Sequence, residues 1–295
     1  MSDATVPATS PEILPPRLAA LLRWAQRNLF AAFCALGFFL IIAMALLAPY
    51  MGLMDPAQID FSNKLLPPSA AHWFGTDGLG RDIFSGVVHG ARVSLLVALG
   101  VVVIAAGIGI PIGLIAGYAG GWLDTIFMRI SDVFLAFPPL LLPITLSALL
   151  GPGLLNALIA VAISWFPWYA RIVRSTVLSV KAELYVQSAR AIGTNPVSIA
   201  LRHVLPNSLS PVIVQASMDF GFAILTTASL SFIGMGAVPP AVEWGLMVAS
   251  SRSVFLEYWW TAMFPGMAIF LTVFFANVLV DSIRDSLDPK LERQP

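Results

Sequence analysis

Six stretches of the chain are long and apolar enough to cross a membrane as helices. A helix needs about 20 predominantly apolar residues to span the hydrocarbon core. The sequence offers such stretches at 28–49, 93–117, 130–150, 154–172, 208–233 and 259–281. Ten-residue segments of alternating polarity, which are typical of membrane β-barrels, do not occur in it. The pattern therefore predicts an all-α membrane protein with six transmembrane helices.

The polar stretches between these spans divide the chain. Residues 1–27 are polar and rich in proline, and the apolar run after them is too long for the core of a signal peptide. We therefore interpret that run as an uncleaved first span. A first unit, 28–92, joins this span to a long loop; 93–284 holds the other five spans, and 285–295 is a polar tail.

The basic residues predict the orientation of the chain. If the N-terminus is cytoplasmic, the outer segments hold four of the 16 Lys and Arg residues, namely Lys64, Arg81, Arg92 and Arg252. Cytoplasmic loops ordinarily carry the excess of Lys and Arg. We therefore expect both termini and the loop at 173–207 on the cytoplasmic side, and the loops at 51–92 and 234–258 outside.

Composition agrees with a membrane protein and excludes several function classes. Hydrophobic residues make up 58% of the chain and charged residues 11%, whereas soluble domains carry about 25% charged residues. The net charge is +0 and the basic residues are scattered, so no nucleic-acid partner is expected. The single cysteine, Cys34, and the three well-separated histidines predict no metal site.

The cytoplasmic segment 178–206 has the signals of two short helices joined by a glycine turn. Residues 178–192 lack Gly and Pro and are rich in good helix formers. Gly193 then suits the position after a helix end, Asn195 can cap a second helix, and Pro196 suits its first turn. A helix lying on the membrane would need a strongly apolar face, which this segment lacks. Its small residues favour close approach of another protein.

One motif in this segment resembles a known family. The motif consists of Gln187-Ser188-Ala189, three residues, Gly193, nine residues, His203, one residue and Leu205-Pro206. It is similar to the cytoplasmic EAA loop of binding-protein-dependent ABC importers. Gln187 and His203 depart from the Glu and Ile of that pattern. The resemblance implies a coupling helix that contacts an ATP-hydrolysing subunit. It implies these coupling residues: Glu183, Gln187, Ser188, Ala189, Arg190, Gly193, His203, Leu205 and Pro206.

Other segments resemble the dipeptide and oligopeptide permeases, and specifically their second permease subunit. They are HWFGTD at 72–77, GRDIF at 80–84, GARVSL at 90–95, LSFIGMG at 230–236, PPAVEWG at 239–245 and DSIRDSLDPKL at 281–291. The implied fold is the type I ABC importer transmembrane domain, which is MetI-like. In this interpretation 93–284 is the permease core, and it contains the coupling loop 178–206.

The same resemblance implies the partners. They are a homologous second permease subunit, two ATP-binding subunits and an extracytoplasmic solute-binding protein. None of the lysines, Lys64, Lys181 and Lys290, follows a G-x-x-x-x-G, so this chain has no P-loop. ATP and Mg are therefore expected in the partner subunits, with no cofactor and no catalytic residue here. The expected location is the bacterial inner membrane, with lipid around a multi-pass bundle.

Polar residues in the fifth span are pore candidates: Asp219, Thr226 and Ser231. An Asp at the bilayer centre costs about 2.5–3.5 kcal/mol, so Asp219 should face a wet cavity or a polar partner. Asp132 and Arg129, near the inner end of the third span, are expected to pair or to reach the interface. The second span carries Gly109, Gly113 and Gly117 at intervals of four, which favours close helix packing.

Alternatives to a peptide importer remain at this point. Nickel chelates, glutathione and opine-like solutes are cargoes of similar permeases. An ion-coupled secondary transporter would show intramembrane carboxylates with internal inverted repeats, and the sequence has one such carboxylate candidate and no convincing repeat. A membrane scaffold without a transport role would not need the long helical cytoplasmic loop.

Overall fold

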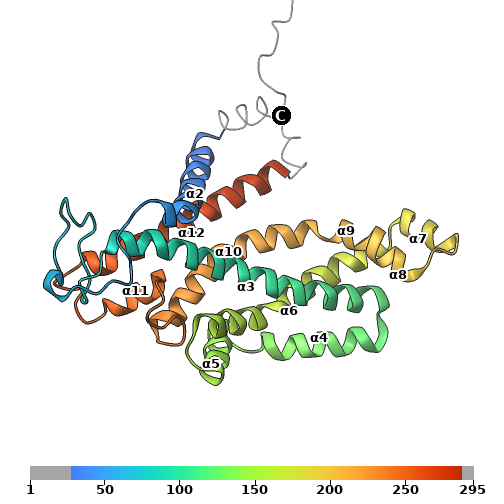
Figure 1. Ribbon diagram of the computed structural model, residues 1–295. Coiled ribbons are helices and arrows are strands. Elements are labelled where there is room, and N and C mark those ends of the chain that lie inside the picture. The colour runs from blue at the N-terminus through green and yellow to red at the C-terminus, as the bar shows by residue number, and fades with distance from the viewer. Residues whose placement is uncertain (1–27, 288–295) are drawn as a thin grey trace, which may run out of the picture.

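The structure, a computed structural model, describes residues 28–287, and within them the chain forms a bundle of helices (Figure 1). The α-helices are α2 (Leu29–Leu47), α3 (Ile83–Ala119), α4 (Gly121–Leu135), α5 (Leu141–Leu150), α6 (Leu154–Lys181), α7 (Leu184–Ala191), α8 (Pro196–Ile199), α9 (Leu205–Ser208), α10 (Ser210–Phe232), α11 (Trp244–Ser250) and α12 (Trp260–Leu287). Short 3-10 turns lie at Ala48–Tyr50 and Phe61–Asn63, and a π-helical turn at Ala200–Val204. The N-terminal segment 1–27 and most of the predicted tail lie outside the described residues.

Five helices in the described region are long and apolar enough to cross a membrane: α2 with its following turn, α3, α6, α10 and α12. They match the first, second, fourth, fifth and sixth predicted spans. Three of them extend further than predicted: α3 begins at Ile83 rather than at 93, α6 continues to Lys181 rather than to 172, and α12 continues to Leu287 rather than to 281. α3 thus begins within the segment that was assigned to the outer loop.

The prediction of a continuous third span at 130–150 was wrong. α4 ends at Leu135, and α5 begins only at Leu141. Pro138 and Pro139 lie in the gap. Proline has no backbone N–H to donate and also disfavours helical backbone in the residue before it. Two adjacent prolines therefore end one helix before the next can start, and the apolar stretch becomes two shorter helices.

The centre of the bundle is the contact between α3 and α6, which run in the same direction. A Cβ atom at Gly109 would lie 2.6 Å from the Phe166 carbonyl oxygen, and one at Gly117 would lie 2.8 Å from Val177 Cγ1. The glycine spacing therefore lets the two backbones approach closely, as the sequence predicted. The fully buried Val173 and Val177 on α6 continue this contact toward the end of the helix.

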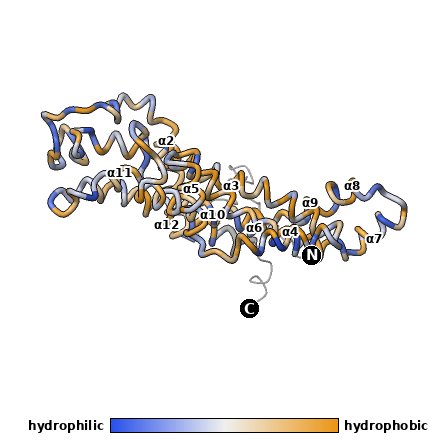
Figure 2. The backbone as a smooth tube through the Cα atoms, turned by 90° about the horizontal axis from the view of Figure 1, so that it is seen from below, coloured by the Kyte–Doolittle hydropathy of each residue, from blue (hydrophilic) through white to orange (hydrophobic). Residues whose placement is uncertain are grey.

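The two long connections lie at opposite ends of the molecule. α7 and α8 form one end, and the segment before α3 together with α11 forms the other (Figures 1 and 2). α2 and α12 pack against each other, with the rings of Phe33 and Phe275 in edge-to-face contact at 6.0 Å. The long helices therefore connect two separate loop regions, one at each end of the bundle.

We expect Gly113→Ala to destabilise the protein and Gly107→Ala, on the same helix, to leave it unchanged or slightly more stable. A methyl group at Gly113 would collide with the Ala170 carbonyl and lie 2.7 Å from Val173 Cβ, whereas nothing lies within 4 Å of the corresponding position at Gly107. Overpacking costs about 1–3 kcal/mol, while alanine gains up to about 1 kcal/mol over glycine in a helix. Thermal unfolding of the two detergent-purified variants measures the difference. Equal melting temperatures would contradict the close packing of this contact.

Candidate functional site

The end of α6 is fixed to the end of α3 where the predicted coupling loop begins. The Lys181 ammonium donates hydrogen bonds to the carbonyl oxygens of Tyr118 at 2.7 Å and Gly117 at 3.5 Å. A cation at a helix C-terminus interacts favourably with the last carbonyl groups, which lack partners within the helix. The start of the loop is therefore held by the α3–α6 pair.

The helix predicted over 178–192 is divided in two. Residues 178–181 belong to α6, and α7 begins at Leu184 after Glu183, whose backbone is extended (φ −68°, ψ 145°). No glycine or proline marks this turn, so local signals could not predict it. Val186 on α7 is fully buried and joins the cluster that contains Val177 and Ile199. Burial of this one side chain holds α7 against the rest of the loop.

The glycine turn after α7 forms as the sequence predicted. Gly193 has a φ of +79°, which favours glycine. Its N–H donates to the Arg190 carbonyl at 3.1 Å, and the Thr194 N–H donates to the Ala189 carbonyl at 3.1 Å. These two bonds make a Schellman motif, which satisfies carbonyl groups left free at the end of a helix.

The second helix also begins as predicted. The Asn195 side chain accepts a hydrogen bond from the Val197 N–H at 2.9 Å, and Pro196 occupies the first turn of α8. This arrangement is an N-cap followed by a proline that needs no donor. α7 and α8 are thus two ordered helices joined by a short turn.

The chain returns to the bundle through α8, the π turn and α9. Ile199 and Val204 are fully buried beneath the loop, and Leu205 packs against the same cluster. The carbonyl of His203 accepts the Asn207 side-chain amide at 2.6 Å and the Tyr185 hydroxyl at 3.5 Å. Pro206 lies in the first turn of α9, just before α10. The loop is therefore connected by packing and by the chain itself to α10 as well as to α6.

The outer face of α7 is open and has apolar side chains at both ends. Leu184 is 78% exposed and Ile192, just after the helix, is 82% exposed. Between them the exposed surface includes Gln187, Ser188 and Arg190, together with Tyr185 and Ala191. Large apolar groups flanking small and polar ones suit a short helix that enters a groove of another protein. Ala189 points to the opposite, inner side, where it packs on the buried cluster.

Gln187 departs from the glutamate of the family pattern, and its side chain forms a hydrogen bond within this chain. Its side-chain amide donates a hydrogen bond to the Ala182 carbonyl at 2.8 Å, across the turn between α6 and α7. A glutamate carboxylate could not donate this bond, because an ionised carboxylate is only an acceptor. The glutamine therefore stabilises the turn that places α7.

Two ion pairs connect α4 to α6. The Asp124 carboxylate accepts hydrogen bonds from both Nε and Nη2 of Arg174, and the bond from Nη2 is 2.6 Å long. Asp132 pairs with Arg171 and lies 3.8 Å from Arg129. The expectation that Asp132 is paired is confirmed, with a second partner on a different helix. A two-pronged Arg–carboxylate contact fixes orientation as well as distance.

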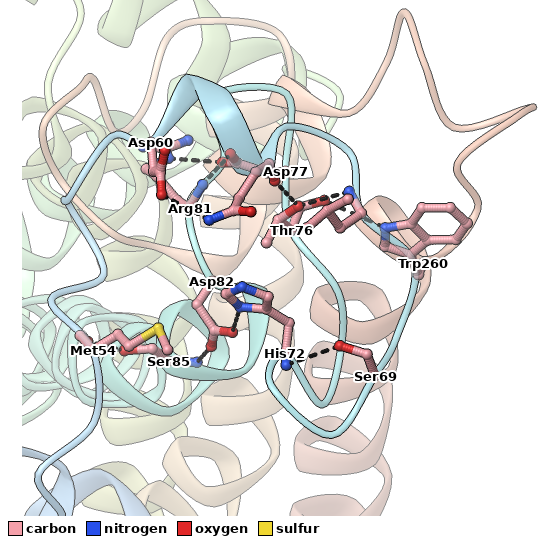
Figure 3. A network of polar contacts seen from close by, with 12 residues as sticks. Met54, Asp60, Ser69, His72, Thr76, Asp77, Arg81, Asp82, Ser85 and Trp260 are labelled. Atoms are coloured by element: carbon pink, nitrogen blue, oxygen red, sulfur yellow. Dashed lines mark hydrogen bonds and ion pairs between the residues drawn. The ribbon is translucent and has the colours of Figure 1, made fainter.

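At the other end of the molecule, the segment before α3 is an ordered unit held by polar contacts (Figure 3). Asp82 caps α3 by accepting the Ser85 N–H at 2.7 Å, and its other oxygen contacts His72 Nδ1 at 2.9 Å. Asp77 accepts Arg81 Nε at 2.7 Å. Hydrogen bonds from Ser62 and Asn63 hold the pKa of Asp60 below its ordinary value. These contacts within residues 60–85, called the outer network after the loop predicted to lie outside, rest on α3.

The outer network also reaches the helices that follow the fifth span. The Trp260 indole at the start of α12 donates to the Thr76 carbonyl at 3.3 Å. Glu243 is almost fully buried and caps α11 by accepting the N–H groups of Gly245 at 2.8 Å and Leu246 at 2.9 Å. The Trp244 indole donates to the Val87 carbonyl of α3 at 2.8 Å. Glu243 and Trp244 belong to a motif identified by resemblance alone, and the Trp244 contact could not be predicted because Val87 lies 157 positions earlier in the chain.

The three pore candidates lie on α10, and their role in a pore stays a prediction. Thr226 is buried and its hydroxyl donates to the Phe222 carbonyl at 2.8 Å. Ser231 is also buried, and its hydroxyl accepts the Ala237 N–H at 3.1 Å. Asp219 is half-buried and accepts the Gln215 side-chain amide at 2.8 Å. Of the three, Asp219 is the side chain that keeps partial exposure.

We expect Gly80→Ala to loosen the outer segment and Gly78→Ala to leave it intact. Gly80 has a φ of +76°, and a Cβ there would collide with the Asp60 carbonyl, whereas nothing lies within 4 Å of that position at Gly78. The left-handed backbone alone costs about 1–2 kcal/mol for alanine, which is about a 5- to 30-fold change in an opening equilibrium. Limited proteolysis of the purified protein should therefore cut within 51–82 faster in Gly80→Ala. Identical cleavage rates in both variants would contradict the ordered unit.

Comparison with known proteins gives matches along most of the chain. The family model described as "Binding-protein-dependent transport system inner membrane component" matches residues 109–293. The probable D,D-dipeptide transport system permease protein DdpC of Escherichia coli (strain K12) is 49% identical over 251 residues, which cover 85% of this chain and 84% of that protein. The dipeptide transport system permease protein DppC of Alkalihalophilus pseudofirmus is 48% identical, covering 85% and 83%.

A third relative and a solved structure agree with these matches. The glutathione transport system permease protein GsiD of Pectobacterium atrosepticum is 46% identical over 254 residues, covering 86% of this chain and 84% of that protein. Among solved structures, a chain of the MetNI methionine ABC transporter in an inward-facing conformation aligns with a TM-score of 0.56 and 18% identity. It covers 70% of this chain and 98% of that chain, and the likeness shows a shared MetI-like fold.

Proposed function

The chain belongs to the family of binding-protein-dependent transport system inner membrane components, and from this premise we propose that it forms half of a peptide pathway driven by separate ATPase subunits. It is the permease subunit of a binding-protein-dependent importer and a multi-pass inner membrane protein. The observation that carries the proposal is α7, a short helix with an open outer face and a fully buried anchor at Val186.

We propose that α7 is the contact with an ATPase subunit. Its exposed ends, Leu184 and Ile192, would enter a groove of that subunit, with Gln187, Ser188 and Arg190 between them. The inner side is held by Val186 and by the Schellman turn at Gly193. The ATPase would bind ATP and Mg, and this subunit would take no part in hydrolysis. Two such subunits, one for each permease, would act on the two α7 helices.

The second permease and the solute-binding protein complete the proposed assembly. α10 leaves large apolar side chains uncovered in the single chain, such as Phe222 at 58% and Leu225 at 43% exposure. We propose that a homologous permease faces them across the pathway. The outer network and the segment around α11 would receive the solute-binding protein, since both lie at the end opposite α7 (Figure 1).

Di- and oligopeptides are the cargo we propose. Relatives with dipeptide, D,D-dipeptide and glutathione in their names all match at 46–49% identity. Those three solutes share peptide-like backbones, which favours a peptide over a nickel chelate or an opine. An ion-coupled secondary transporter is less well supported, because the family and the coupling helix both indicate an external energy source.

We expect Gly193→Val to weaken coupling while leaving the protein in the membrane. Valine at a φ of +79° strains the turn that ends α7 by about 1–2 kcal/mol or more, although no neighbouring atom lies within 4 Å. Thr194→Val places the same side chain one residue later and serves as the control. Peptide uptake into vesicles that contain the whole transporter should fall about 5- to 30-fold for Gly193→Val, with ATPase subunits still bound. Normal uptake by that variant would refute the coupling role of this turn.

We also expect the two ends of the molecule to face opposite compartments, with both termini and α7 in the cytoplasm. Val197 on α8 and Ala57 in the outer segment are exposed, and the native Cys34 is fully buried. In a Cys34→Ser background, Val197→Cys should react with a membrane-impermeant thiol reagent only in inside-out vesicles. Ala57→Cys should react only in right-side-out vesicles. The reverse pattern would overturn the proposed orientation.

A further inference from the structure

Tyr169 on α6 has a buried hydroxyl group that lacks a hydrogen-bond partner. Its side chain is fully buried, and within residues 28–287 no group hydrogen-bonds its Oη atom. Buried phenol groups almost always find a partner, because desolvation without one is unfavourable. The position of the ring is set by close contact with α3, since a Cβ at Gly109 would lie against the Tyr169 Cβ. The hydroxyl is therefore held in place with no hydrogen bond inside the described part of the chain.

The carboxylate of Asp219 on α10 lies beside this hydroxyl. Ala216, three residues before Asp219 on the same helix, packs against the buried cluster that contains Tyr169. The carboxylate and the hydroxyl are therefore near enough to interact electrostatically. One carboxylate oxygen accepts the Gln215 amide at 2.8 Å. No Lys, Arg or His of the described region forms an ion pair with Asp219. A carboxylate inside a span without a cation is costly, and such residues usually mark a site that serves a solute.

These three side chains together offer hydrogen-bond acceptors. The Gln215 amide nitrogen donates to Asp219, and its carbonyl oxygen accepts no hydrogen bond from residues 28–287. The carboxylate and the phenol supply further oxygen atoms. A primary ammonium group has one positive charge and three N–H donors. Its charge and donors match the cluster, whereas a carboxylate or phosphate would be repelled by Asp219.

A solute can approach this cluster from one side. Asp219 is half-buried, and Phe222, one turn further along α10, is 58% exposed. Residues three apart on a helix are neighbours on its surface. The carboxylate therefore lies at the border between the closed α6–α10 contact and the uncovered face of α10, which we assign to the pathway.

We propose that Asp219, Gln215 and Tyr169 form a site that binds the α-ammonium group of a peptide during its passage. This inference rests on the proposed function, because it assumes that the uncovered face of α10 borders the pathway. The Asp219 carboxylate would neutralise the positive charge of the peptide ammonium group at the edge of the pathway. The Tyr169 hydroxyl would accept a hydrogen bond from that ammonium group, which is the partner it lacks in the single chain. The site would thus add selection for a free amino terminus to that made by the binding protein.

The test measures peptide binding to the whole transporter without the solute-binding protein. The permease pair with its ATPase subunits is placed in lipid nanodiscs, and saturation-transfer NMR compares Ala-Ala with N-acetyl-Ala-Ala. The wild type should bind Ala-Ala at least about tenfold more tightly than the acetylated peptide, as expected for a hydrogen-bonded charge. Asp219→Asn and Tyr169→Phe should each lose that preference. Ser217→Ala is the control, because its hydroxyl donates to its own helix at the Ile213 carbonyl.

Tyr169→Phe separates a ligand role from a structural one. A purely structural role predicts unchanged or higher thermal stability with unchanged binding, because the variant removes only an unpaired hydroxyl. Reduced Ala-Ala binding with unchanged stability supports the site. Equal binding of both peptides by the wild type, or wild-type binding by both variants, overturns it. ATP-driven uptake of peptide by the wild-type transporter, measured with the binding protein present, tests the proposed function separately.

Discussion

The close contact between α3 and α6 is the constraint on which the remaining architecture depends. Gly109, Gly113 and Gly117 remove the side chains that would hold the two backbones apart. In a membrane, where lipid tails are as apolar as the side chains, such close packing is a main source of helix association. The same contact positions Tyr169 beside α10 and ends at Lys181, where the α7 loop begins. Two sites at different positions along the bundle therefore depend on one helix pair.

Hydropathy was enough to predict most of the spans, because about 20 apolar residues leave the chain few alternatives in lipid. It failed at 136–140, where composition stays apolar but Pro138 and Pro139 remove backbone donors. The turn before α7 was missed for the opposite reason. Residues 178–192 are good helix formers throughout, and only burial of Val186 in a distant cluster reveals that α6 and α7 are separate. Tertiary packing overrides helix propensity here.

The candidate site residues likewise include some whose roles the sequence could predict and some whose roles it could not. Gly193, Asn195 and Pro196 act through their own backbone, so their roles in the turn were readable from spacing alone. Gln187 looked like a loss of charge, and its bond to the Ala182 carbonyl required knowledge of the turn. Tyr169 carried no signal at all. It became a candidate because its hydroxyl lies near Asp219, fifty positions later in the sequence, and has no hydrogen-bond partner in the described part of the chain.

The length of α3 has a mechanical consequence. Its 37 residues correspond to about 55 Å at 1.5 Å per residue, while the hydrocarbon core is about 30 Å thick. The helix is therefore long enough to project beyond the lipid, carrying Asp82 and Val87 near one end and the carbonyl groups that hold Lys181 at the other. Although Pro111 lies within it, the helix is continuous from Ile83 to Ala119. Over this length, a tilt of about 5° displaces one end by about 5 Å relative to the other. Displacements at the two ends of α3 are therefore linked, because one continuous helix joins them.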